Sequence, residues 1–84
     1  MAKLTKRIVD GAGAGEKDYF IWDEELPGFG LRVFASGKRS YLIQYRAQGR
    51  TRRYTIGLHG VWTAETARQE AKIQLGRVAK GENP

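Results

Sequence analysis

Residues 28–56 read GFGLRVFASGKRSYLIQYRAQGRTRRYTI, and this stretch decides the fold. Two short glycine-containing segments, at 36–39 and 48–50, separate three runs that are rich in β-branched and aromatic residues. Such runs favour strands, and a short turn between successive strands makes them antiparallel. The stretch therefore predicts a meander with strands over 29–35, 40–47 and 51–56.

The flanking segments extend this meander into an α+β fold. Aromatic and β-branched residues over 19–23 predict a leading strand, which ends before the break at Leu26-Pro27-Gly28. Downstream, Thr63 is a suitable N-cap for a helix over 63–80. One apolar stripe runs along that helix: Ala64, Ala67, Ala71, Leu75 and Val78. We expect a three- to four-stranded antiparallel β-meander packed on one face by a C-terminal α-helix.

The chain of 84 residues has the length of one small domain. We expect a mobile N-terminal segment over 1–17, in which Thr5 caps one short helical turn, then the sheet over 18–56 and the helix over 63–80. The glycines at 11, 13 and 15 form a connector and no dinucleotide fingerprint, because Glu16 stands where a third glycine would fall. Since the chain has no cysteine, one sheet packed on one helix must hold the core.

Positive charge is concentrated in the predicted sheet. No acidic residue lies between Glu25 and Glu65, whereas seven arginines and lysines do, and the whole chain carries a formal charge of +6. A folded surface that collects cations repels itself, and a polyanion such as nucleic acid relieves that repulsion. The alternative is a polar face that only meets solvent, but such faces normally mix both signs of charge. The pattern favours nucleic-acid binding.

Alternation along the strands divides the side chains into two faces. Leu31, Val33 and the tyrosines at 41 and 45 share the apolar face that receives the helix. The opposite face carries the residues that we expect to contact base edges in the major groove, namely Arg32, Gln44, Arg46, Arg53 and Thr55. The expected phosphate contacts are the cations at the turns and the N-terminus: Lys38, Arg39, Arg50, Arg52, Lys3, Lys6 and Arg7. Phe34 and Leu42 also fall on the polar face, where they could touch thymine methyl groups or dock a partner.

The remaining polar and aromatic residues carry weaker signals. His59, the single histidine, is expected to be solvated or a local hydrogen-bond partner, and the acids at 23–25 are expected to serve a turn. Trp22, Phe29 and Trp62 are expected mainly in the core. The sequence has no nucleophile–base pair, metal-ligand spacing or phosphate loop, so we expect neither catalysis nor a cofactor.

Several ordered blocks of this sequence resemble one known family. The blocks are 28–41, Tyr45-Arg46, Tyr54-Thr-Ile-Gly-Leu, 63–71 and the ending Lys80-Gly-Glu-Asn-Pro. Together they are similar to the amino-terminal arm-binding domain of tyrosine recombinases, the integrases of temperate phages, genomic islands and conjugative elements. The resemblance covers nearly the whole chain and is weakest over 1–17.

The resemblance implies a sheet that enters the major groove of arm-type sites, in a chain excised from a longer integrase. It implies that the catalytic residues lie in a separate domain, so no tyrosine of this chain is the nucleophile. Implied partners are double-stranded DNA, other integrase protomers and accessory DNA-bending proteins, with a bacterial cytoplasmic location and no membrane. Two alternatives stay open: a double-stranded RNA-binding domain, and a protein-interaction module that regulates recombinase assembly.

Overall fold

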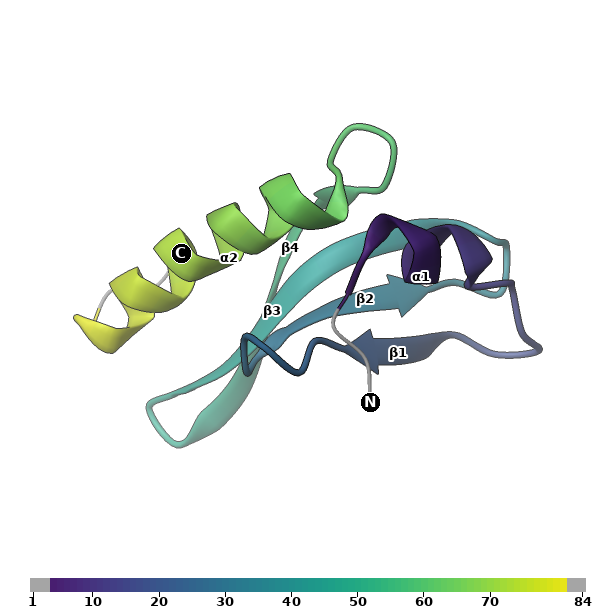
Figure 1. The fold of residues 1–84 in the computed structure, drawn as a ribbon. Coiled ribbons are helices and arrows are strands. Elements are labelled where there is room, and N and C mark those ends of the chain that lie inside the picture. Colours follow the sequence, from purple (N-terminus) through teal and green to yellow (C-terminus); the bar gives the residue numbers. More distant parts are fainter. Residues whose placement is uncertain (1–3, 82–84) are drawn as a thin grey trace.

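The computed structural model describes residues 4–81, and its elements follow the order α1, β1 to β4, α2. The four strands, Tyr19–Trp22, Phe29–Val33, Arg39–Ala47 and Arg50–Leu58, form one antiparallel sheet in sequence order. The helices are α1 (Lys6–Gly11) and α2 (Ala64–Ala79). Figure 1 shows that both helices lie over the same face of the twisted sheet and leave the other face open. The predicted α+β meander with a C-terminal helix is confirmed.

The strand register explains which side chains form the core. Leu31 pairs with Tyr41 and Phe29 pairs with Ile43, and all four side chains are fully buried beneath the helices. Strand β4 runs two residues beyond the predicted end at Ile56, because Leu58 still pairs with Ser40 after a bulge beside Tyr41 and Leu42. The apolar side of the sheet is thus the one predicted from alternation.

Helix α2 is fixed at its start and packs through small side chains. The Thr63 hydroxyl accepts from the Thr66 backbone N–H at 3.1 Å, and the Thr66 hydroxyl accepts from the Thr63 N–H at 2.9 Å. This reciprocal cap satisfies two backbone donors that the helix itself leaves free. Ala64, Ala67 and Ala71 of the predicted stripe are buried, and their small size brings the helix axis close to the sheet.

Helix α1 makes a second contribution to the core that the sequence analysis did not include. Thr5 caps it as expected, by accepting from the Ile8 N–H at 3.3 Å. Leu4 and Val9 are fully buried and Ala12 nearly so, all within the main hydrophobic cluster. A sheet packed on one helix is therefore an incomplete description of the core, while the mobility expected of residues 1–17 stays a prediction. Residues 1–3 lie outside the described range.

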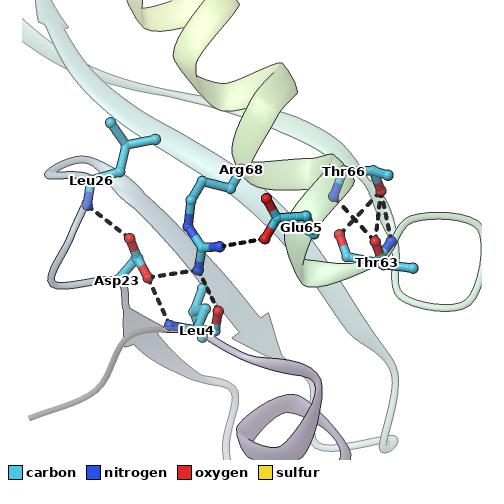
Figure 2. Close-up of polar contacts among 7 residues, drawn as sticks. All are labelled: Leu4, Asp23, Leu26, Thr63, Glu65, Thr66 and Arg68. Carbon is cyan, nitrogen blue, oxygen red and sulfur yellow. Dashed lines mark hydrogen bonds and ion pairs between the residues drawn. The ribbon is translucent and has the colours of Figure 1, made fainter.

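A buried ion pair joins the two ends of the domain (Figure 2). The Asp23 carboxylate accepts from the Leu4 N–H at 2.7 Å, from the Leu26 N–H at 2.8 Å and from Arg68 at 3.1 Å. Arg68, on α2, also donates to the Leu4 carbonyl. Burial raises the pKa of Asp23, but the Leu4 N–H, Arg68 and the Leu26 N–H together lower it further, so the net direction is downward. The expected turn role of Asp23 is confirmed, and the link to α2 is additional.

Candidate nucleic-acid interface

The uncovered face of the sheet, here called the open face, is built from alternate residues of all four strands. Pairing places Phe20 beside Arg32, Arg32 beside Ser40, Leu42 beside Thr55 and Gln44 beside Arg53. The open face includes Phe20, Trp22, Arg32, Phe34, Ser40, Leu42, Gln44, Arg46, Thr51, Arg53, Thr55 and Leu58. All five residues predicted to contact base edges therefore lie on one side of the molecule, opposite both helices.

Arg53 is held in place at the centre of this face. Its Nε donates to Gln44 Oε1 at 3.0 Å across β3 and β4, and its guanidinium carbon lies 4.8 Å from the centre of the Phe20 ring. Within residues 4–81 its two terminal NH₂ groups make no hydrogen bond. A guanidinium fixed through Nε presents those two groups as a pre-aligned pair of donors.

Arg46 and Gln44 face open space farther along β3. The exposed Arg46 makes one long contact, from Nη2 to the Gly49 carbonyl at 3.4 Å. Both side chains line a shallow hollow of about 360 Å³ beside Pro27 and Gly28. The β3–β4 hairpin, which projects from the sheet in Figure 1, therefore carries an exposed cation that makes no ion pair within residues 4–81.

Arg32 is less available to bind a ligand than its place in the sequence suggested, because it already has an acidic partner. Its Nη2 donates to Asp18 at 2.8 Å, while the other Asp18 oxygen accepts from the Ala35 N–H at 2.9 Å. The Ala35 N–H, followed by Arg32, lowers the pKa of Asp18, so the carboxylate stays charged. The stretch without acids was taken to leave its cations unopposed. That expectation is wrong for Arg32, because β1–β2 pairing brings in an acid from before the stretch.

Aromatic rings on the open face stack with these cations. The guanidinium of Arg32 lies 4.6 Å from the Phe34 ring centre and 5.7 Å from that of Phe20. Trp22 stacks on Phe20 with ring centres 5.4 Å apart and remains 40% exposed. The expectation that Trp22 packs in the core is wrong, whereas Phe29 is fully buried and Trp62 packs against the core. Strand alternation places Trp22 on the same face as Phe20, and this could have been read from the sequence. The sequence did not show which face is the open one, because both faces of β1 are apolar.

The residues predicted to contact phosphate are more scattered. Lys38 is exposed in the turn between β2 and β3, and Arg50 is exposed where β4 begins. Arg52 pairs with Tyr45, so it points to the helix side of β4 although it is exposed. Arg39 pairs with Val33 on the helix side, where its Nε donates to the Ala12 carbonyl at 2.9 Å. Its place in β3 and its contact with Ala12, the residue that follows α1, differ from the expected turn position.

The two described N-terminal cations, Lys6 and Arg7, lie on the covered side of the sheet. Lys6 and Arg7 belong to α1, which Figure 1 places over the same face as α2. Lys6 borders a hollow of about 230 Å³ between the beginnings of the two helices. Lys3 lies outside the described residues. The structure therefore does not bring Lys6 and Arg7 together with Arg53 and Arg46.

His59 joins three elements on the covered side. Its Nδ1 lies 2.8 Å from the Tyr41 hydroxyl, and its Nε2 lies 3.1 Å from an Asp10 carboxylate oxygen. Burial, followed by the Asp10 charge, raises the pKa of Tyr41 to about 12. His59 was expected to be either solvated or a hydrogen-bond partner, and the structure shows the second. Among residues 4–81, no three histidine or acidic side chains gather as they would around a metal ion.

A twisted antiparallel sheet with helices on one face and arginines on the other is an arrangement suited to binding nucleic acid. Comparison with known proteins agrees: residues 4–84 match the family described as Arm DNA-binding domain. The chain belongs to this family and is a DNA-binding domain, as the sequence resemblance had indicated.

A curated relative, the prophage integrase IntZ of Escherichia coli (strain K12), is 30% identical over 81 residues. That alignment covers 96% of this chain and 20% of the relative. The chain thus spans about a fifth of the length of the integrase that it resembles. In the described part of the chain, no helix is both long enough and apolar enough to cross a membrane.

Proposed function

We propose that this domain binds arm-type sites in duplex DNA by placing the open face of its sheet in the major groove. The observation that supports this most is the convergence of Gln44, Arg46, Arg53 and Thr55 on the face that no helix covers. The major groove of B-DNA is wide enough for a β-ribbon, and it carries a distinct pattern of donors and acceptors for each base pair.

Within that arrangement, Arg53 is the principal reader. Its free pair of NH₂ groups matches the O6 and N7 acceptors of guanine, and Gln44 and Phe20 hold it before DNA arrives. Arg46 and Thr55 contact bases on either side of it. Arg32 contributes less, because its guanidinium must either break its ion pair with Asp18 or bind Asp18 and DNA at the same time.

Phosphate contacts come from the margins of the same face. Lys38 lies at one turn and Arg50 at the opposite hairpin, so the two cations can reach backbones on either side of the groove. Arg39 is excluded from this set by its bond to Ala12. Arg52, Lys6 and Arg7 would need DNA that wraps around the domain.

The domain would serve inside a tyrosine recombinase that integrates a phage or genomic island. This part of the proposal is supported by the likeness to a prophage integrase, of which the chain matches 20%. Catalysis would reside in another part of such a protein, which would act with further integrase protomers and accessory DNA-bending proteins. Its DNA substrate would place it in the bacterial cytoplasm.

The test is a binding titration of the 84-residue chain on duplex DNA at several salt concentrations, with duplex RNA as competitor. The logarithm of the affinity should fall with the logarithm of salt concentration at about −0.9 per phosphate contacted. Duplex RNA should compete poorly, because its deep and narrow major groove does not admit side chains. Equal competition by RNA, or affinity that ignores salt, would contradict the proposal.

A further inference from the structure

The open face contains a small hollow whose wall is partly apolar, and the proposed contacts of the arginines with DNA give this apolar wall no role. The hollow has a volume of about 90 Å³. Phe20, Phe34 and Leu42 supply its apolar wall, Arg32 and Arg53 border it, and the hydroxyl side chains of Ser40 and Thr55 complete it. It is separate from the main core, which lies on the opposite side of the sheet.

Leu42 is the most buried of the residues that line this hollow. It is only 4% exposed although it points away from both helices, and it is absent from the main hydrophobic cluster. The side chains around it therefore shield it from water on the face that meets DNA. An apolar wall bordered by two arginines suits a ligand that brings an apolar group inside an anionic frame.

In the major groove, one base has such a group. Thymine carries a methyl group at C5, and apolar side chains recognise it by contact. A water molecule occupies about 30 Å³ of liquid, and a methyl group is of similar size, so the hollow has room for one methyl group and the edge of its ring. Cytosine, adenine and guanine would leave the apolar wall facing polar edges or empty space.

We infer that the hollow formed by Phe20, Phe34 and Leu42 receives the methyl group of a thymine, within one base-pair step of the guanine read by Arg53. The inference rests on the proposed function and adds a specificity-determining contact to it. Arg53 fixes the spacing, because the same side chain borders the hollow and presents its NH₂ pair to the groove. Burying one methyl group contributes about 0.8 kcal/mol, which corresponds to a fourfold change in affinity.

The experiment begins with selection of preferred duplexes from a random library by the 84-residue chain. Each thymine of the selected site is then replaced singly by deoxyuridine, which lacks only the methyl group. We expect the uracil substitution at one position to lower affinity about fourfold. The guanine contacted by Arg53 is located separately, by replacing each guanine with 7-deazaguanine: at that guanine, wild type and Arg53→Ala should then bind with equal affinity. The sensitive thymine should lie next to it. The variants Leu42→Ala and Phe34→Ala should each bind the thymine and uracil duplexes equally.

The matched control is Ile73→Ala, an apolar truncation on the exposed side of α2, where Ile73 is 59% exposed. It should keep the full preference for thymine over uracil. If no uracil substitution weakens binding, or if Leu42→Ala and Phe34→Ala keep the preference, the inference is wrong while DNA binding stands. If no duplex is bound or enriched, the proposed function fails together with it.

Discussion

Asp18 and Arg32 form a 2.8 Å ion pair on the open face, between a residue just before β1 and the next-to-last residue of β2. The pair neutralises one of the cations on this face, and Asp18 also accepts from the Ala35 N–H. Arg32 and Arg53 both lie on the open face, but within residues 4–81 only Arg32 is paired with an acid. This inequality gives a prediction that charge counting alone would not give.

We expect Arg32→Ala to weaken binding to a selected site less than Arg53→Ala does. Arg53 has a free NH₂ pair for guanine, so its loss should cost about 1–3 kcal/mol. Arg32 must first give up its contact with Asp18. Fluorescence anisotropy on one selected duplex measures both losses, and a larger loss for Arg32→Ala would contradict the arrangement.

The variant Asp18→Asn tests the same ion pair from the other side. Asparagine still accepts from the Ala35 N–H but no longer neutralises Arg32, so affinity should rise for every duplex sequence. Titrations on a selected and a scrambled duplex at low salt provide the measurement. The idea fails if the change strengthens one sequence only or weakens both.

Lys38 and Arg39 are neighbours in sequence with opposite expected roles. Lys38→Ala should weaken all duplexes alike and reduce the salt slope by about 1, because an exposed turn cation contacts phosphate. Arg39→Ala should leave the salt slope unchanged and lower thermal stability instead, because Arg39 donates to the Ala12 carbonyl. Salt titrations and thermal unfolding of both variants separate the two roles. A salt slope reduced by about 1 in both variants would show that Arg39 also contacts phosphate, and an unchanged slope in Lys38→Ala would contradict the role of Lys38.

The Asp23–Arg68 ion pair is expected to dominate the effect of acid on stability. Asp23 has a pKa below its ordinary value of 3.8 in the folded chain. Its stabilising contribution is therefore complete above that value and is lost as the pH falls through the lower, folded pKa. Asp23→Ala should destabilise the domain by about 3–5 kcal/mol near neutral pH, because the buried Arg68 loses its buried carboxylate and keeps only exposed Glu65 as an ion-pair partner.

Urea unfolding of Asp23→Ala between pH 7 and pH 2 tests this account. The gap between wild type and variant should narrow only at the acid end of that range. The control Glu24→Gln removes the neighbouring exposed acid and should unfold like wild type. A gap that stays constant down to pH 2 would show that the charge of Asp23 is not what stabilises the fold.

Gly28 is expected to be irreplaceable for backbone reasons. Its φ is +89°, and a Cβ there would lie 2.8 Å from the Gln44 carbonyl oxygen. Gly28→Ala should therefore lower the free energy of unfolding by about 1–3 kcal/mol. Gly13→Ala is the matched control, since a Cβ at Gly13 meets nothing within 4 Å, and it should be nearly neutral. Denaturant unfolding of both variants decides the point.

The sheet, its order and the C-terminal helix were predictable because their signals are local. Turn glycines, strand alternation and the Thr63 cap each act over a few residues, and β2, β3 and α2 begin or end within two residues of expectation. The sharing of one face by Gln44, Arg46 and Arg53 followed from the same alternation. These parts of the fold and of the candidate site needed no long-range information.

The features that the sequence analysis missed depend on contacts between distant segments. Asp18 meets Arg32 only because β1 pairs with β2, and Asp23 meets Arg68 across 45 positions of sequence. Leu4 and Val9 lie in a segment too short to predict burial by periodicity. Arg39 was assigned to a turn, whereas the strand begins one residue earlier and alternation turns it toward the helices. The position of Arg39 could have been predicted, because it alternates in phase with Tyr41 and Ile43, which face the helices.

The central claim is that DNA contacts the open face and that the helices face away from it. The most direct measurement is an amide chemical-shift titration of the 84-residue chain with a selected duplex. The account predicts that the largest shifts fall within residues 30–56, led by strands β3 and β4. Shifts that concentrate along residues 64–80, with the sheet unaffected, would contradict it.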